Sequence, residues 1–281
     1  MHRTRSVTGV IPPDAIVVST ASFNSDDPHR IVVSNAAFVD ALFAEFLTAE
    51  EISEDALRSY FVQYYLAQMQ NGGFAQFVYN CEWDPNVVAK IRDGLRTMGA
   101  RMHQAVFLEG VSTVGELGHD GLDEYLTREY WGDNPVRDRL DVVTEQFVKA
   151  CEVEDLAARN AEWLRSHPKL HVLTRDEMEE EVRRRTIAIP DMPDRLAAAR
   201  EVEPRPVKII RVLCAIAGHE LEHITSGDPT FVYEGTPTLA WRFLTDQGNH
   251  LMIEVGDRAI MLNADGPQQI ICEIAGFDED D

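Results

Sequence analysis

The spacing of apolar residues changes once along the chain, and this change constrains the fold more than any other feature. From about residue 34 to 188, apolar residues recur at steps of three and four, as in Phe38, Ala41 and Leu42, which predicts amphipathic helices. After residue 229, short strand-like stretches are separated by turn pairs such as Gly256 and Asp257, which predicts an antiparallel meander. We therefore predict an α+β protein, with a mainly α-helical N-terminal domain followed by a helix packed on a small antiparallel β-sheet.

Prolines and capping residues divide the chain further. Ser53 and Thr174 are predicted helix N-caps, and the charged run 176–185 is interpreted as a solvated helix. Pro206 is expected to begin a helix over 207–225, with Gly227 as its C-cap. The predicted organisation is an N-terminal arm over 1–33 with a short strand at 15–18, a helical domain over 34–188, a Pro-rich linker over 189–206, a helix plus sheet over 207–277, and an acidic tail over 278–281. The predicted strands are 230–233, 239–245, 250–255, 259–263 and 269–275.

The net charge narrows the classes of partner. The chain has 26 Lys and Arg against 48 Asp and Glu, a net charge of −22, and nearly all the excess lies in 31–136 (6 basic against 16 acidic) and 212–281 (2 against 13). Such a charge disfavours direct binding of nucleic acid and of anionic membranes. It is compatible with a basic protein partner, including the DNA-reading face of another protein.

The expected location is cytoplasmic. The four cysteines are dispersed, at 81, 151, 214 and 272, so they are interpreted as reduced thiols. Pro12, Pro13 and Asp14 interrupt the apolar stretch that a signal peptide would need, and no run approaches the ~20 apolar residues of a membrane span.

One string has the pattern of a zinc hydrolase. His219, Glu220 and His223 fit H-E-x-x-H, in which a helix places two histidines one turn apart on a shared Zn²⁺ and the glutamate activates water. No third ligand stands at a familiar spacing, and both histidines continue the apolar stripe of Ile209 and Ile216. We interpret the string as a structural histidine pair, predict no metal or other cofactor and no catalytic residue, and keep a zinc-dependent hydrolase as the alternative.

A second distinctive string runs over residues 71–80 and contains two adjacent glycines and two phenylalanines. Two glycines permit a tight break between helices, and the two phenylalanines then return to the core, so the string is interpreted as structural. Gln76 and Asn80 lie one helical turn apart and are expected to bond loop backbone. The signature residues are Asn71, Gly72, Gly73, Phe74, Gln76, Phe77 and Asn80.

With the aromatic helix before it, this string resembles the helical domain of the bacterial DNA-mimic-protein-like family. The resemblance covers about residues 40–170, and Asn160 to Leu164 fits the end of that domain. It implies an acidic, dimeric, non-enzymatic protein that binds a helix-turn-helix repressor and keeps it off its operator. A mimic of this kind must hold carboxylates at a density comparable to that of phosphates on a rigid surface.

These observations lead to one leading hypothesis for function and two alternatives. The leading hypothesis is an acidic binding protein, a monomer or a homodimer, that sequesters a DNA-binding regulator. The alternatives are the zinc hydrolase and an immunity-type protein that neutralises a toxin. The partner-binding candidates are Asp40, Glu45, Glu50, Glu51, Glu54, Asp55, Asp120, Asp123, Glu124 and Glu129.

Overall fold

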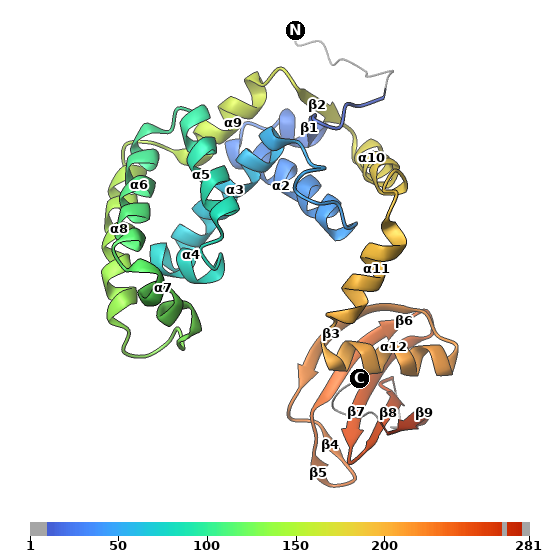
Figure 1. Ribbon diagram of the computed structural model, residues 1–281. Helices are drawn as coiled ribbons and strands as arrows, with labels where there is room; N and C mark the ends of the chain where they lie inside the picture. The colour runs from blue at the N-terminus through green and yellow to red at the C-terminus, as the bar shows by residue number, and fades with distance from the viewer. Residues whose placement is uncertain (1–9, 266–268, 277–281) are drawn as a thin grey trace. The chain divides into compact units, whose positions relative to one another are not determined.

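The computed structural model describes residues 10–265 and 269–276, which form two compact units divided between Pro190 and Asp191 (Figure 1). Unit 1 is helical with one small parallel strand pair, and unit 2 contains an antiparallel five-stranded sheet. The predicted α+β class is therefore confirmed. The predicted acidic tail and residues 1–9 of the predicted arm lie outside the described residues.

Unit 1 is dominated by helices, several of which pack against helices that are not their neighbours in sequence. Its elements are β1 (Ile16–Ser19), α1 (Thr20–Phe23), α2 (Pro28–Ala44), α3 (Glu54–Asn71), α4 (Gly73–Asn80), α5 (Pro85–Thr97), α6 (Arg101–Gly115), α7 (Gly118–Thr127), α8 (Pro135–Cys151), α9 (Leu156–Ser166), β2 (Leu170–Leu173) and α10 (Arg175–Ile187). The predicted N-caps are confirmed: the hydroxyl oxygen of Ser53 accepts from the Ala56 amide, and Thr174 and Glu177 form a capping box.

The segment predicted as an N-terminal arm is built into unit 1, so for residues 10–33 that prediction is wrong. The strand predicted at 15–18 does form, as β1, and it pairs in parallel with β2 with Ile16 opposite Leu170. Ile16, Val17 and Val18 are fully buried. A strand that is buried on both faces consists of consecutive apolar residues, as β1 does. A run of four such residues does not indicate which other segment the strand pairs with.

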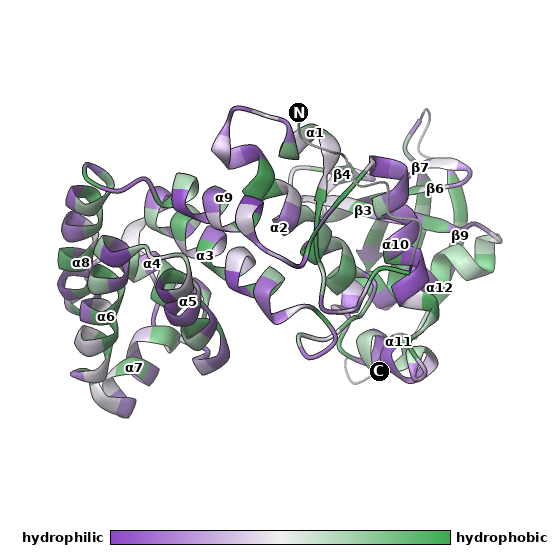
Figure 2. Cartoon of the chain, turned by 90° about the horizontal axis from the view of Figure 1, so that it is seen from above, coloured by the Kyte–Doolittle hydropathy of each residue, from purple (hydrophilic) through white to green (hydrophobic). Residues whose placement is uncertain are grey.

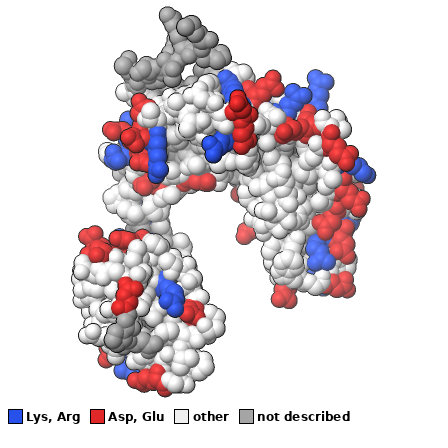
Figure 3. All heavy atoms as spheres, turned by 180° about the vertical axis from the view of Figure 1, so that it is seen from behind, with Lys and Arg blue, Asp and Glu red and all other residues white. Residues whose placement is uncertain are grey.

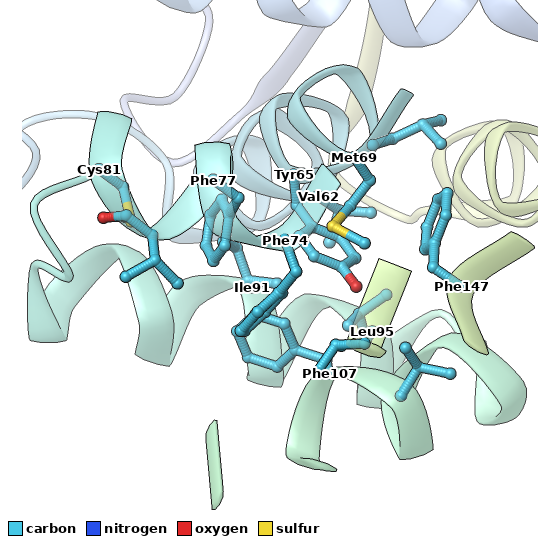
Figure 4. Close-up of a cluster of buried hydrophobic side chains, with 14 of the residues drawn as sticks. Val62, Tyr65, Met69, Phe74, Phe77, Cys81, Ile91, Leu95, Phe107 and Phe147 are labelled. Atoms are coloured by element: carbon cyan, nitrogen blue, oxygen red, sulfur yellow. The ribbon is translucent and has the colours of Figure 1, made fainter. Parts of the chain in front are cut away.

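The core of the helical part is aromatic. The Tyr65 ring makes edge-to-face contacts with Phe77, Phe107 and Phe147, with ring centroids 5.2–5.8 Å apart. Phe74 and Phe77 are fully buried in the same cluster (Figure 4). The prediction that both phenylalanines return to the core is confirmed.

Helix α10 is exposed at most of its charged positions, as its sequence predicted, but two of them are buried. It is strongly hydrophilic, as Figure 2 shows in purple, yet Glu181 is only 4% exposed and Arg185 only 7%. The carboxylate of Glu181 accepts hydrogen bonds from Arg184 and Arg185 at 2.7 Å, and Arg185 also donates to the carbonyls of Pro12 and Pro13. The charged face of α10 therefore anchors the segment that leads into β1.

This buried ion pair predicts a pH-dependent contribution to stability. Burial alone would raise the pKa of Glu181, but the hydrogen bonds and charges of Arg184 and Arg185 outweigh it and hold the pKa below the ordinary 4.5. We expect Glu181→Gln to lower the free energy of unfolding near neutral pH by about 2–4 kcal/mol, because it leaves two arginines unpaired. A group with a depressed folded-state pKa stabilises above its unfolded pKa, so the loss should be full above about pH 5.5 and shrink as the pH falls through the folded-state pKa.

Urea unfolding from acid to neutral pH measures this dependence. Glu180→Gln is the matched control, because Glu180 is the exposed neighbour on the same helix and has no arginine bound to it among the described residues. A Glu181→Gln penalty that is the same at every pH would contradict the ionic explanation.

The described part of unit 2 consists of two helices, a five-stranded sheet with strand order β3-β6-β7-β8-β9, and a separate two-stranded sheet of β4 and β5. One face of the sheet is covered by α12, whose buried Ile210 and Leu213 pack with Phe243 and Met261. The elements are α11 (Met192–Glu201), α12 (Arg205–Ala217), β3 (Leu221–Asp228), β4 (Val232–Tyr233), β5 (Thr236–Pro237), β6 (Ala240–Thr245), β7 (Gly248–Val255), β8 (Arg258–Asn263) and β9 (Ile270–Ala275).

Two details of unit 2 correct the sequence analysis. The helix expected over 207–225 ends at Ala217, capped by Gly218 at a φ of 72°, and the next residues form the edge strand β3. The Pro-rich segment expected as a linker contains α11. Among the described residues, no helix is both long enough and apolar enough to cross a bilayer.

Candidate partner-binding surface

The signature string closes a corner between α3, α4 and α8. Gly73 has a φ of 77°, a left-handed conformation that side chains disfavour, and a Cβ placed there would lie 2.4 Å from the Thr144 hydroxyl. That hydroxyl accepts the Phe74 amide at 2.9 Å. The second glycine of the pair therefore lets α8 approach the start of α4 directly.

Two polar signature residues, Gln76 and Asn80, are held by the side chain of Gln68. The side-chain carbonyl of Gln68 accepts from the amides of Gln76, at 3.0 Å, and Asn80, at 2.8 Å. A Cβ at Gly72 would lie 2.0 Å from the side-chain Oε1 of Gln76, so this glycine makes room for the Gln76 side chain that binds Gln68. The expectation that Gln76 and Asn80 bond loop backbone is wrong: they link α4 to the end of α3 through a side chain.

Packing at this corner places α8 beside α6 in antiparallel orientation. Gln146 of α8 donates to the Glu109 carboxylate of α6 at 2.6 Å. Near the start of α8, Arg139 forms an ion pair with Glu116, which directly follows the end of α6. Inward-facing Val143 and Phe147 are buried in the core, so the carboxylates of both helices face outward. Figure 3 shows Asp and Glu along the edge of unit 1 that α6 to α8 form, with few Lys and Arg among them.

We name these carboxylates the acidic band. All of them are exposed except Asp141, which is half-buried, and only four cationic side chains, Arg128, Arg137, Arg139 and Lys149, lie within the same stretch of sequence. The band consists of eleven residues: Glu109, Glu116, Asp120, Asp123, Glu124, Glu129, Asp133, Asp138, Asp141, Glu145 and Glu152.

The charge density of the band can be compared with that of DNA. Asp138, Glu145 and Glu152 follow one another at seven-residue steps, which puts them on one side of α8 about 10 Å apart. The 17 residues of α8 span about 25 Å, and a duplex of that length carries about 15 phosphates. The eleven carboxylates of the band, seven of them on α6, α7 and α8, approach that number before the four cations are subtracted.

The electrostatic environment of the band is uneven. Burial, with the neighbouring charge of Asp138, holds the pKa of Asp141 above its ordinary value, although Arg137 pulls it down. Asp123 lies 3.5 Å from His119, and Glu124 lies 3.7 Å from Arg128. Asp120, Glu129 and Glu145 form no ion pair within the described residues, so their charges face solvent uncompensated.

The ten predicted partner-binding residues fall into two groups. Asp120, Asp123, Glu124 and Glu129 belong to the acidic band. The other six, Asp40, Glu45, Glu50, Glu51, Glu54 and Asp55, lie around the end of α2 and the start of α3, away from α7 in both Figure 1 and Figure 2.

Several carboxylates of the α2–α3 group are already bound within the protein. Asp55 accepts from Arg58 at 2.6 Å and from Lys169 at 3.3 Å. Partial burial would raise the pKa of Asp55, but these hydrogen bonds outweigh it and keep the pKa below its ordinary value. Glu54 lies 2.8 Å from Arg58 and 3.4 Å from Lys90. This group is therefore partly neutralised, whereas the band carries a larger net charge.

Seven residues of the band were missed by the sequence analysis. They are Glu109, Glu116, Asp133, Asp138, Asp141, Glu145 and Glu152. Four of them, on or directly after α8, lie in the stretch 137–211, which also contains the arginines of α10. The 15 basic and 16 acidic residues of that stretch nearly cancel, so its net charge did not point to a site. The seven-residue spacing along a predicted helix was the signal that could have found the α8 members.

The H-E-x-x-H string lies on no helix, so the premise of the zinc-site alternative is wrong. His219 and Glu220 lie in the loop after α12, and His223 is an exposed residue of β3. Extended residues four apart are about 13 Å from each other, too far for two imidazoles to share one ion at ~2 Å. Among residues 10–265 and 269–276, no group of three His, Cys, Asp or Glu is placed to hold a metal.

The histidines have separate surroundings. The His219 ring lies 5.1 Å from the ring of His250, whose Nε2 is 2.8 Å from the Thr245 hydroxyl. Burial, together with the nearby His219, lowers the pKa of His250. His219 therefore pairs with a histidine from β7, while His223 stands apart.

The fold and the acidic band define a helical domain with a carboxylate-rich outer surface. Residues 50–167 match the family model described as DMP19-like protein, the DNA mimic protein family, and this confirms the resemblance seen in the sequence. The matched segment runs from before α3 to the end of α9 and contains the whole acidic band. At the level of the family, the match supports a DNA-mimic-type protein. Comparisons with curated proteins and with solved structures give no significant match.

Proposed function

We propose that this protein is a non-enzymatic acidic binding protein that occupies the DNA-reading face of a basic partner, a helix-turn-helix regulator, and keeps it from its DNA. The observation that carries the proposal is the acidic band: eleven carboxylates inside the family-matched segment, seven on α6, α7 and α8 and four in the segments directly after these helices. The helices fix the spacing of the seven charges that they carry, and a DNA-reading surface requires such fixed spacing of its ligand.

The distribution of basic residues also supports the proposal. Residues 137–211 contain 15 Lys and Arg, which on a single surface would oppose mimicry. Only Arg137, Arg139 and Lys149 of these lie on α8. Arg184 and Arg185 of α10 donate to the Glu181 carboxylate and to the backbone carbonyls of Ile11 and Pro13. The cations thus leave most of the band's charge in place.

Capture from native lysate tests the proposal. We expect the tagged full chain to retain a DNA-binding protein at low salt and to release it both to a salt step and to competing duplex DNA. Interactions between exposed charges are largely screened beyond the Debye length, which is ~10 Å at 0.1 M salt and shortens as salt is added, so affinity should fall at least about tenfold between low and high salt.

Two results would contradict the proposal. A partner that is retained at high salt would exclude the electrostatic mode of binding. A partner that ignores duplex DNA would exclude mimicry and favour the immunity-type alternative. Light scattering of the free chain and of the complex measures whether the band is presented by one copy or by a homodimer.

A further inference from the structure

Unit 2 contains a cavity of about 480 Å³ beside α12. The end of α11, one side of α12 and the first residues leading into β3 form its walls, and it is open to solvent; its lining includes Arg200, Lys208, Arg211, Val212 and His219. Its volume lies within the roughly 300–1,000 Å³ of pockets that bind small organic molecules.

The lining of the cavity is basic, although the unit that contains it is acidic. Residues 191–281 hold seven Lys and Arg against seventeen Asp and Glu, yet three of the seven cations line this one cavity. Glu203 is the one carboxylate in its lining, and it is held by Arg211 through two nitrogens at 2.8–3.0 Å. Arg200 and Lys208 have no carboxylate within ion-pair distance among the described residues, so two positive charges stand uncompensated at the cavity.

The remaining wall is apolar and neutral. Val212 is 39% exposed, an unusual position for a valine on a helix that packs on a sheet, and Leu221 and Ala215 continue the same wall. Cys214 also lines the cavity, and burial raises the pKa of its thiol to about 11, so the thiol is uncharged and does not repel an anion. A ligand for this cavity needs an anionic head and an apolar body.

We propose that this cavity binds a small organic phosphate, with its dianionic head against Arg200 and Lys208 and its apolar body against Val212 and Leu221. A phosphate monoester carries close to two negative charges near neutral pH, which matches the two uncompensated cations, whereas a carboxylate supplies one. The proposal does not rest on the partner-binding function of unit 1.

Titration calorimetry of the full chain with phenyl phosphate tests the site. We expect saturable binding of one molecule per chain, at least tenfold tighter than that of inorganic phosphate, which has the head alone, and of benzoate, which has one charge. Lys208→Gln should weaken the binding of phenyl phosphate at least tenfold. Arg258→Gln is the matched control, because Arg258 is an exposed cation of the same unit, paired with Glu273 and outside the cavity.

Several results would overturn the proposal. The chain has a net charge of −22, so without a built site an anion should be repelled and no saturation should appear. Absence of saturation, or an equal loss in the Arg258→Gln variant, would exclude the site. Benzoate binding as tightly as phenyl phosphate would exclude the phosphate assignment. Circular dichroism of each variant ensures that a lost signal reflects the cavity and not the fold.

Discussion

Neutralising three carboxylates of the acidic band should weaken binding of the DNA-binding partner by about 10- to 100-fold. The variant combines Asp120→Asn, Glu129→Gln and Glu145→Gln, three exposed residues that form no ion pair within the described part of the chain. Each charge removed from an electrostatic interface typically costs about 0.5–1 kcal/mol, and three together reach this range. Fluorescence anisotropy with the labelled partner at two salt concentrations measures both the affinity and its salt dependence, and the variant should show the shallower dependence.

The control separates the band from the overall charge. Glu222→Gln, Glu234→Gln and Asp257→Asn change the net charge by the same amount at exposed positions of unit 2. If long-range attraction by the whole molecule were responsible, both triple variants would weaken binding equally. We expect the unit 2 variant to remain within about twofold of the wild type, since the three carboxylates changed in it do not belong to the band. Equal losses would contradict the assignment of the band.

Local signals in the sequence identified most elements correctly, and the failures share one physical cause. The helical period, the caps at Ser53 and Thr174 and the turn glycines each act within a few residues, so they can be recognised without the fold. The strands β6 to β9 were found because turn pairs such as Gly256 and Asp257 separate them. What was missed depends on partners distant in sequence.

Two glycines compete as the C-cap of α12. Gly218 and Gly227 both follow an apolar stretch and both are plausible C-caps, and only Gly218 takes the left-handed conformation. Of the expected stripe of Ile209 and Ile216, Ile209 is fully buried but Ile216 is 54% exposed, while Ile210 and Leu213 pack against the sheet. The rotation of that helix is decided by the sheet it covers, which no helical pattern contains.

The acidic band shows the same limitation at the level of the site. Its members become one surface because α6 and α8 pack side by side, with Glu109 opposite Gln146. When charges are counted along the sequence, the carboxylates of α8 fall in the same stretch as the arginines of α10. Two of those arginines bind Glu181 in another part of unit 1 and do not neutralise the band. Site residues that depend on packing between helices are therefore visible only once the fold is known.

Gly73→Ala should be among the most destabilising single substitutions in unit 1, lowering the free energy of unfolding by about 2–4 kcal/mol. A left-handed φ of 77° alone costs a residue with a Cβ about 1 kcal/mol. The added Cβ would also meet the Thr144 hydroxyl at 2.4 Å and its methyl group at 2.9 Å. Relief requires α8 to move away, which would break the hydrogen bond from the Phe74 amide to Thr144 and loosen the buried rings of Phe74 and Phe77.

Gly99→Ala is a control that shares the backbone strain without the contact. Gly99 has a φ of 68°, and a Cβ placed there would meet nothing within 4 Å, so it should cost only about 1 kcal/mol. Urea unfolding of both variants measures the difference, which isolates the close approach of α8. Because that approach orients the helix bearing Asp138, Glu145 and Glu152, Gly73→Ala should also weaken partner binding under conditions in which the variant is still folded. Equal penalties for the two glycines would mean that the signature is conformational only and that the acidic band does not depend on it.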